Sequence, residues 1–237
     1  MKVIVIPDVH LKSWLFDRAE ELLNSGKADR AVCLMDIPDD WNKEFQVNLY
    51  RETLDRAIEF AEKHPETLWC YGNHEISYLW GKLETGYSPY AEDIVITKLR
   101  ELKIMCLENM TFVHRIDNVI FSHGGLASVF VERIDPELTD ADIDEVIAAV
   151  NRVPQEDMWN DLSPLWLRPQ VYDVEAFRSS DYIQVVGHTP VDRIYARGGF
   201  ISTDVLSTYP DGPQIGESAL IIIDTVTGEY EKVTIKQ

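Results

Sequence analysis

Residues 2–10 read Lys2-Val3-Ile4-Val5-Ile6-Pro7-Asp8-Val9-His10, and this pattern decides the fold. The β-branched residues at positions 3–6 predict a short buried strand, which Asp8 and His10 follow closely. The same order, an apolar run and then Asp, Asn or His, recurs along the chain. The later runs are 31–34 before Asp36 to Asp40, 67–71 before Gly72 to Glu75, 119–121 before Ser122 to Gly125, and 183–186 before Gly187 to Pro190.

Amphipathic stretches lie between these runs. Apolar residues recur at helical spacing over 15–23 and 50–61, and Gly26 and Pro65 mark the ends of these two predicted helices. Further helices are predicted over 92–101 and from the cap-like Thr139 to about Asn151, and further strands over 200–202 and 220–223. The alternation of strands and helices predicts an α/β fold with parallel strands near the start.

We expect a single domain over residues 1–237, because no linker or repeat interrupts the chain. The segment 127–180 is rich in Pro, Trp and acidic residues and could form an irregular insertion that makes one wall of a site. The longest apolar stretch near the C-terminus, 219–223, is far too short to span a bilayer.

The charge excludes several classes of partner. The chain has 22 basic and 41 acidic side chains, a formal net charge of −19. Such a surface repels phosphate backbones and anionic lipids, so we expect neither a nucleic-acid partner nor a membrane. Nothing in the sequence indicates an oligomeric state.

The three cysteines, Cys33, Cys70 and Cys106, are odd in number and lack paired metal-ligand spacing. We therefore expect buried reduced thiols, not a disulfide framework or a structural zinc site. No secretory apolar region precedes Pro7, and together these observations predict a cytoplasmic protein.

The polar residues after the runs are ligands for hard or borderline metal ions. In an α/β sheet, ligands and chemistry gather at the carboxyl ends of the strands. Each residue alone has a commoner explanation: Asp8 and Asp36 as turn or cap residues, His123 and His188 as core histidines, Asn73 as a turn residue. Glu75 could cap a helix or support a ligand. The recurrence of Asp, Asn or His after successive apolar runs favours a metal site.

Taken in order, five motifs resemble the set found in calcineurin-like metallophosphoesterases, most closely the serine/threonine phosphoprotein phosphatase branch, which includes diadenosine tetraphosphate hydrolases. The resemblance spans residues 8–190 and implies a metallophosphoesterase-type β-sandwich of mixed sheets flanked by helices, in four layers α/β/β/α. The motifs are Asp8-x-His10, Asp36-x-x-Asp39, Gly72-Asn73-His74-Glu75, His123-Gly124-Gly125 and Gly187-His188-Thr189.

The resemblance also implies two divalent or trivalent metal ions. It assigns Asp8 and His10 to the first ion, Asn73, His123 and His188 to the second, and Asp36 to both. Oxygen and imidazole ligands without thiolate suit manganese, iron or zinc, and we expect manganese or iron. A hydroxide between the two ions would attack phosphorus directly.

In this resemblance His74 is the general acid that protonates the leaving group, oriented by Asp39. The sequence departs from the family where Met35 replaces a Gly and Asp40-Trp41 replaces Arg-Gly. Because that arginine would bind the phosphate, another group must do so. Arg168, in a Trp-x-Arg element, is the candidate, with Lys12 as the alternative and Asn73 as a further substrate contact.

The predicted function is hydrolysis of phosphate monoesters, in a phosphoprotein or a small phosphoester. The enzymatic alternative is cleavage of a dinucleoside polyphosphate or another nucleotide. A nuclease is disfavoured by the acidic balance and by Pro190, where a second histidine would stand. A scaffold that binds phosphorylated ligands without cleaving them is favoured only by the altered segment 39–41. Four aromatic residues could stack a base, although core packing is the favoured interpretation: Tyr78, Trp80, Tyr87 and Tyr90.

Overall fold

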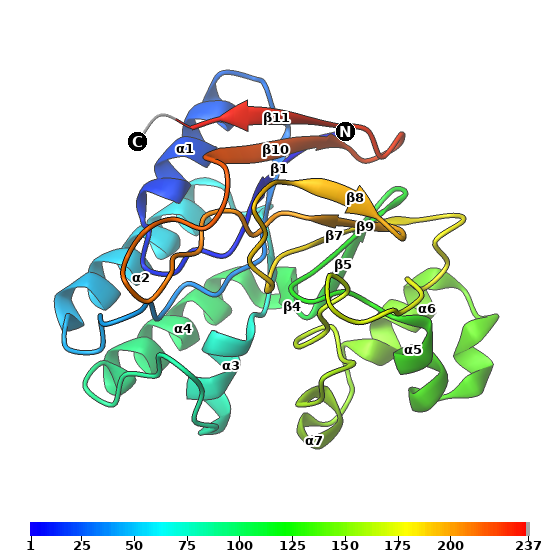
Figure 1. The fold of residues 1–237 in the computed structure, drawn as a ribbon, viewed down its shortest axis with the longest axis horizontal. Helices are drawn as coiled ribbons and strands as arrows, with labels where there is room; N and C mark the ends of the chain where they lie inside the picture. Colours follow the sequence, from blue (N-terminus) through cyan, green and yellow to red (C-terminus); the bar gives the residue numbers. More distant parts are fainter. Residues whose placement is uncertain (236–237) are drawn as a thin grey trace.

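The computed structural model describes residues 1–235, in which two mixed β-sheets lie between helices (Figure 1). The predicted fold class is confirmed. In sheet order, the first sheet comprises β11 (Tyr230–Thr234), β10 (Ala219–Asp224), β1 (Lys2–Ile6), β2 (Arg30–Cys33), β3 (Leu68–Cys70) and β4 (Met110–Thr111). The second comprises β5 (Val113–Ile116), β6 (Val119–Ser122), β7 (Ile183–Val186), β9 (Phe200–Ser202) and β8 (Tyr195–Arg197).

The central strands of both sheets are parallel. In the first sheet β1 to β4 run parallel, and β10 and β11 add an antiparallel edge. In the second sheet β6, β7 and β9 run parallel between antiparallel β5 and β8. The loops that leave the carboxyl ends of the parallel strands therefore emerge on one edge of each sheet.

Helices cover the outer faces of the sheets (Figure 1). The helix α1 packs on β1 and β2, and α2 packs against both α1 and α4. On the second sheet α6 packs against β5. The helices are α1 (Trp14–Asn24), α2 (Val47–Lys63), α3 (Asn73–Trp80), α4 (Glu92–Cys106), α5 (Ser128–Ile134), α6 (Ile143–Val150) and α7 (Gln155–Met158), with short 3-10 turns at Leu107–Asn109 and Pro136–Thr139.

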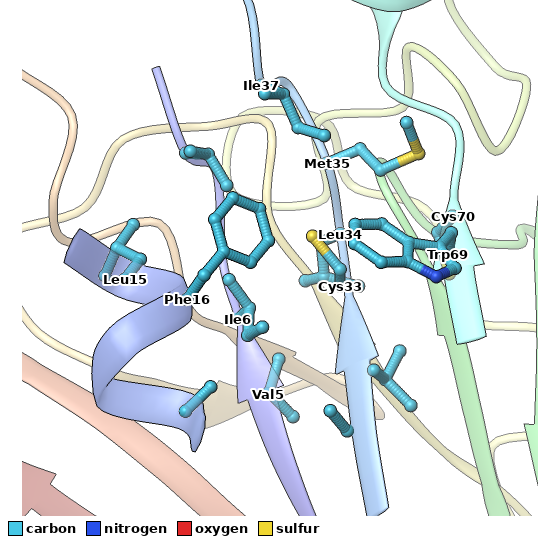
Figure 2. Close-up of a cluster of buried hydrophobic side chains, with 14 of the residues drawn as sticks. Val5, Ile6, Leu15, Phe16, Cys33, Leu34, Met35, Ile37, Trp69 and Cys70 are labelled. Carbon is cyan, nitrogen blue, oxygen red and sulfur yellow. The ribbon is translucent and has the colours of Figure 1, made fainter. Parts of the chain in front are cut away.

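The main core lies between α1, the first sheet and the inner face of the second sheet. Figure 2 shows Leu15 and Phe16 of α1 lying beside β1, the strand that carries Val5 and Ile6. The ring of Phe16 lies 6.0 Å from that of Trp69 on β3. The same cluster includes Val185 and Ile201 from β7 and β9, so the two sheets share one core. Burying each large apolar side chain contributes roughly 1.5–3 kcal/mol.

The segment 127–180 contains more regular structure than its composition predicts. Its helices α5, α6 and α7 pack a second apolar cluster with residues of β5 and β6. The side chain of Asp142 accepts the N–H of Asp144, so the cap lies at the end of the predicted stretch 139–142, α6 begins at Ile143, and Thr139 itself belongs to a 3-10 turn. The single domain over 1–237 stays a prediction, and its last two residues lie outside the described range.

The thiol prediction is confirmed, since Cys33, Cys70 and Cys106 are free and buried. Burial raises the pKa of Cys106 to about 11 and that of Cys33 well above its usual range. Among the helices of residues 1–235, none has the length and apolar character needed to cross a membrane.

Candidate active site

The loops after β1, β2, β3, β6, β7 and β9 bring the predicted polar residues together beside a cavity of about 290 Å³. Ligand atoms of His10, Asp36 and His74 lie within 4.8 Å of one another, as do those of Asp36, His123 and His188. Asp36 belongs to both groups. The residues that line the cavity include His10, Asp36, Asp39, Asn73, His74, Arg168, His188 and Asp204.

Four ligand atoms converge around the ring of His123. Its Nε2 lies 3.1 Å from Oδ2 of Asp36, 3.1 Å from Oδ1 of Asn73 and 3.0 Å from Nδ1 of His188. One ring nitrogen can donate fully to only one of these acceptors, whereas a cation among them could bind all four atoms. The set predicted for the second ion, together with Asp36, is therefore assembled.

A hydrogen bond from Nδ1, the ring nitrogen away from the other ligand atoms, orients the ring of His123. Its Nδ1 donates to the carbonyl of Leu34, at 2.8 Å, and Nδ1 of His10 donates to the carbonyl of Asp39, at 2.9 Å. A donating Nδ1 leaves Nε2 with its lone pair for a metal. Both histidines thus present Nε2 to the site, as histidine ligands in metal centres do.

Asp8 and His10 are the two residues that the resemblance assigns to the first ion alone. The Nε2 of His10 is 4.0 Å from Oδ2 of Asp36, and Oδ1 of Asp8 lies 4.0 Å from Nδ1 of His123. The backbone N–H of His188 donates to Oδ1 of Asp8, at 2.7 Å. His10 therefore lies near Asp36, less tightly than the four atoms around His123, whereas neither group of ligand atoms within 4.8 Å of one another in residues 1–235 includes Asp8.

An unpartnered atom tests whether metal ions fit this set. Within residues 1–235, Oδ2 of Asp8 is buried and has no hydrogen-bond partner. A buried polar atom without a partner costs free energy, and a metal ion would remove that cost. The residues present therefore fit cations beside Asp36, which shares one group of ligand atoms with His10 and His74 and another with His123 and His188.

The electrostatics point the same way. Burial lowers the pKa of His123, but the Asp36 carboxylate outweighs it and raises that pKa to about 9. Burial raises the pKa of Asp36, but His123 and His74 hold it well below its usual range. Burial, with Asp204 next, raises the pKa of Asp8. Without metal, protons on histidine balance the buried carboxylates, and cations can replace those protons.

His74 and Asp39 form the predicted pair. The Nδ1 of His74 lies 2.9 Å from Oδ2 of the buried Asp39. The hydroxyls of Tyr50 and Tyr78 donate to Oδ1 of Asp39, at 3.0 and 2.6 Å. Burial lowers the pKa of His74, but Asp36 and Asp39 raise it to about 9. The sequence did not indicate that these two tyrosines bind Asp39.

Glu75 has both roles that the sequence left open: it caps a helix and supports a ligand residue. Its carboxylate accepts the N–H of Gly72, at 3.1 Å, and so caps the start of α3. It also accepts the N–H groups of Asp36 and Ile37, at 3.1 and 2.5 Å, which ties the loop after β2 to α3. Burial and the Asp36 carboxylate raise the pKa of Glu75 to about 7.

The backbone at the site is strained. His10, Met35, Asp36, Asp39 and His188 have φ values of 41°, 63°, 45°, 68° and 62°, in the left-handed region. Each costs about 1–2 kcal/mol for an L-residue. Met35 stands where the resembled family has glycine, and its φ explains why glycine suits the position. Hydrogen bonds between the loops after β1 and β2, such as His10 N–H to the Asp36 carbonyl at 2.7 Å, stabilise this geometry.

Two motif glycines are required by close approach to carboxylates. A Cβ at Gly187 would lie 2.0 Å from Oδ2 of Asp8, and one at Gly72 would lie 2.1 Å from Oδ1 of Asp36. Neither residue is among those with positive φ in residues 1–235. The reason for glycine here is therefore steric, and it lies in the site itself.

Substitution of Gly187 by alanine is expected to displace Asp8 and to weaken metal binding by roughly 10–100-fold, the size seen when residues that orient ligands are changed. Metal content after dialysis, measured by mass spectrometry, checks this. Gly26→Ala is the matched control, because Gly26 has φ +71° and nothing within 4 Å of its Cβ position. It should lose about 1–2 kcal/mol of stability and keep its metal. Equal metal content in both variants would contradict the steric explanation.

The departure at Asp40 is compensated locally. The Nζ of Lys12 lies 3.4 Å from Oδ2 of Asp40 and donates to the carbonyl of His10, at 3.1 Å. The hydroxyl of Thr208 donates to Oδ1 of Asp40, at 2.8 Å. Lys12 lines a separate groove and is absent from the lining of the main cavity. This geometry disfavours Lys12 as the phosphate ligand.

Arg168 lines the main cavity beside His188. Its Nη1 donates to the carbonyl of His188, at 3.2 Å, and to the hydroxyl of Thr189, at 3.3 Å. A guanidinium has five N–H groups, so the rest of its edge can bind a phosphate. The segment 127–180 therefore contributes to the wall of the cavity, through Trp166 and Arg168.

The aromatic residues of the cavity differ from those singled out in the sequence. Tyr78 is buried and stacks on Tyr87 at 4.2 Å, which agrees with core packing. None of Tyr78, Trp80, Tyr87 and Tyr90 lines the cavity described in residues 1–235. The aromatic lining comes from Trp41, which is 43% exposed, and from Trp166.

Asp204 is a cavity residue that sequence reasoning missed. It follows β9, at 1% exposure, and its pKa is raised to about 6 by burial against opposing hydrogen bonds from Ser207. The signal was present, because the apolar run 200–202 is followed by Thr203 and Asp204, in the same order as the other five runs.

Comparisons with known proteins agree with this arrangement. A family model described as calcineurin-like phosphoesterase matches residues 1–213. Among solved structures, the cold-active protein-tyrosine phosphatase of a psychrophilic Shewanella species is 21% identical, with a TM-score of 0.57 over 98% of this chain and 80% of that one. Another structure of a cold-active protein tyrosine phosphatase is 19% identical, with a TM-score of 0.58 over 98% and 78%.

A metallophosphoesterase from Sphaerobacter thermophilus is 15% identical, with a TM-score of 0.46 over 100% of this chain and 89% of that one. At these identities the structural likeness concerns the fold alone. A comparison with curated proteins finds no significant match.

Proposed function

The chain belongs to the calcineurin-like phosphoesterase family and is a hydrolase of phosphoesters, and on that premise we propose that it is a phosphomonoesterase of the serine/threonine protein phosphatase type with two metal ions. Manganese or iron is the proposed metal, with zinc as an alternative, because the ligands are oxygen and imidazole. A cytoplasmic location belongs to the same proposal, supported by three free buried thiols.

One observation carries the proposal. Asp36 shares its carboxylate between two groups of ligand atoms, one with His10 and His74 and one with His123 and His188. When bound, a pair of ions would place positive charge on the phosphate oxygens and lower the pKa of the attacking water. A chain of net charge −19 needs such a local reversal of sign to bind a phosphate dianion.

The chain's own residues then bind and protonate the substrate. Arg168 would bind phosphate oxygens from the wall next to His188, and Asn73 would contact the substrate from the start of α3. His74 presents Nε2 to the cavity while Asp39 holds Nδ1, so it can donate a proton to the leaving oxygen. A hydroxyl leaving group, as in phosphoserine, needs that proton because an alkoxide leaves poorly.

A second candidate function is hydrolysis of a nucleotide or dinucleoside polyphosphate. Trp41 favours it, because a half-exposed indole at the cavity can stack on a planar ring. The segment around it is held in place, since Asn42 donates to the carbonyl of Pro210, at 2.8 Å. The same indole could also contact the ring of a phosphotyrosine.

The test uses the manganese-loaded protein on matched substrates: phosphoserine, phosphothreonine and phosphotyrosine peptides, an aryl phosphate, and diadenosine tetraphosphate. Phosphate release from the monoesters, faster than cleavage of the dinucleotide, is the expected result. Rapid and selective dinucleotide cleavage would replace the first candidate by the second. No turnover on any substrate with both metals bound would favour a binding scaffold instead.

Trp41→Leu separates the two candidates further. If the indole stacks on a ring, kcat/KM for ring-bearing substrates should fall by up to ~10-fold, which corresponds to the ~0.5–1.5 kcal/mol of an aromatic contact. The value for phosphoserine peptides should stay unchanged, which makes that substrate the internal control. A uniform fall in kcat/KM on all substrates would mean that Trp41 supports the fold of its loop and does not contact a substrate ring.

A further inference from the structure

Asp204 stands at the same sheet edge as His188. It follows β9, which pairs in parallel with β7, with Ser202 opposite Val186. Its side chain is 1% exposed and lines the cavity with His10 and Asp36. The topology thus brings a further carboxylate to the site, and the mechanism above does not use it.

The two oxygens of Asp204 have different surroundings. Ser207 holds Oδ1, through its hydroxyl at 2.7 Å and its backbone N–H at 3.3 Å. Within residues 1–235, Oδ2 is buried and has no hydrogen-bond partner. A buried carboxylate oxygen without a donor is costly, so it indicates a group that the polypeptide itself does not supply.

The surroundings of Asp204 indicate which kind of ligand its unpartnered oxygen would bind. Asp204 lines the cavity with Asp36, and Oδ2 of Asp8 lies 2.0 Å from the Cβ position of Gly187, which follows β7, the strand paired with β9. The Nζ of Lys12 is bound to Asp40 and to the His10 carbonyl. Oδ2 of Asp8 is also buried and unpartnered in the described chain. Two neighbouring carboxylates with unpartnered oxygens repel each other unless a cation lies with them.

We infer that Asp204 helps to hold the cation on the Asp8 and His10 side of Asp36, with Ser207 orienting its carboxylate. This rests on the proposed metal pair. The side around His123 has four convergent ligand atoms, whereas on the other side Nε2 of His10 lies 4.0 Å from Oδ2 of Asp36. Asp204 supplies the missing anionic oxygen where the set is incomplete.

The test is a manganese titration of the chelator-treated full chain by calorimetry, comparing the wild type with Asp204→Asn. In the wild type we expect two sites. In D204N one site should weaken by roughly 10–100-fold while the other is unchanged. Glu84→Gln is the matched control, because Glu84 lines the same cavity at its partly exposed mouth and has no place in the metal set. It should keep both affinities.

Thermal melting gives an independent readout. Without metal, D204N should melt at or above the wild-type temperature, because one of the facing carboxylates is gone. The rise in melting temperature on adding manganese should therefore be smaller than in the wild type. A residue that only accepts from Ser207 or balances Lys12 would leave that rise unchanged.

Ser207→Ala tests the same idea with the carboxylate in place, and it applies even if D204N does not fold. It removes the hydroxyl that orients Oδ1, so the same site should weaken by a smaller factor. Unchanged affinities in both variants, or an unchanged S207A where D204N does not fold, would overturn the inference and leave the proposed function standing. A wild type that binds fewer than two ions would instead overturn the proposed function.

Discussion

Asp36→Asn is expected to lose at least one bound metal ion and to lower turnover by ~10²–10³-fold, the loss seen when one electrostatic group is removed from an active site. Asp36 is the residue that both groups of ligand atoms share. The substitution keeps the shape of the side chain, and an amide oxygen can still accept the N–H of His74, which Oδ1 accepts at 3.0 Å. What it removes is the negative charge between the two ions.

Asp40→Asn is the matched control for this prediction. Asp40 lines the same cavity, but its carboxylate is bound to Lys12 and Thr208. Metal content by mass spectrometry and melting temperature should be measured for both variants. We expect D40N to keep both ions. If D36N also kept both ions and its turnover, Asp36 would not bridge them.

His74→Asn should lower turnover by ~10²–10⁴-fold, the usual contribution of a general acid, and leave the metal content intact. The reason is that the two ring nitrogens of His74 have different partners. Nδ1 is held by Asp39, at 2.9 Å, and Nε2 is left for the leaving group. The loss should be smallest for substrates whose leaving group needs no proton, such as aryl phosphates with acidic phenols, so comparing them with phosphoserine peptides measures the role directly.

The geometry is also compatible with His74 as a metal ligand. Its ligand atom lies within 4.8 Å of those of His10 and Asp36, so a metal could bind it. Loss of metal in H74N would make His74 a ligand and end its role as the acid. Asp39→Asn should resemble H74N, and the double variant should lose little more than either single one, because the two residues act as a unit.

Much of the site could be predicted because its residues follow strands whose type and end are visible locally. The runs over 3–6, 31–34 and 183–186 became β1, β2 and β7 nearly unchanged, and parallel pairing alone places the residues after them on common sheet edges. The helices α1 and α2 also lie where apolar spacing predicted them.

The elements that escaped prediction lack such local signals. β11 has the burial pattern of a half-exposed edge, with charged residues Glu231 and Lys232, and β4 spans two residues. Their pairing depends on partners distant in the sequence, and burial against those partners decides strand formation. The predicted helix over 92–101 continues to Cys106, and Leu102 and Cys106 are buried in the main core.

Residues that support the site were harder to predict than these strands and helix ends. Tyr50 and Tyr78 meet at Asp39 from two helices, and no spacing in the sequence relates them. Gly187 and Gly72 are explained only by the carboxylates that approach them across the sheet edge. Such roles arise from contacts between segments that fold together, so a linear pattern cannot display them.

The most direct test of the whole account is anomalous diffraction from crystals of the full chain grown with manganese. The account predicts two anomalous peaks per chain, both in contact with the carboxylate of Asp36, one also bound by Asp8 and His10 and the other by Asn73, His123 and His188. A single peak at saturating manganese, or two peaks of which only one touches Asp36, would contradict it.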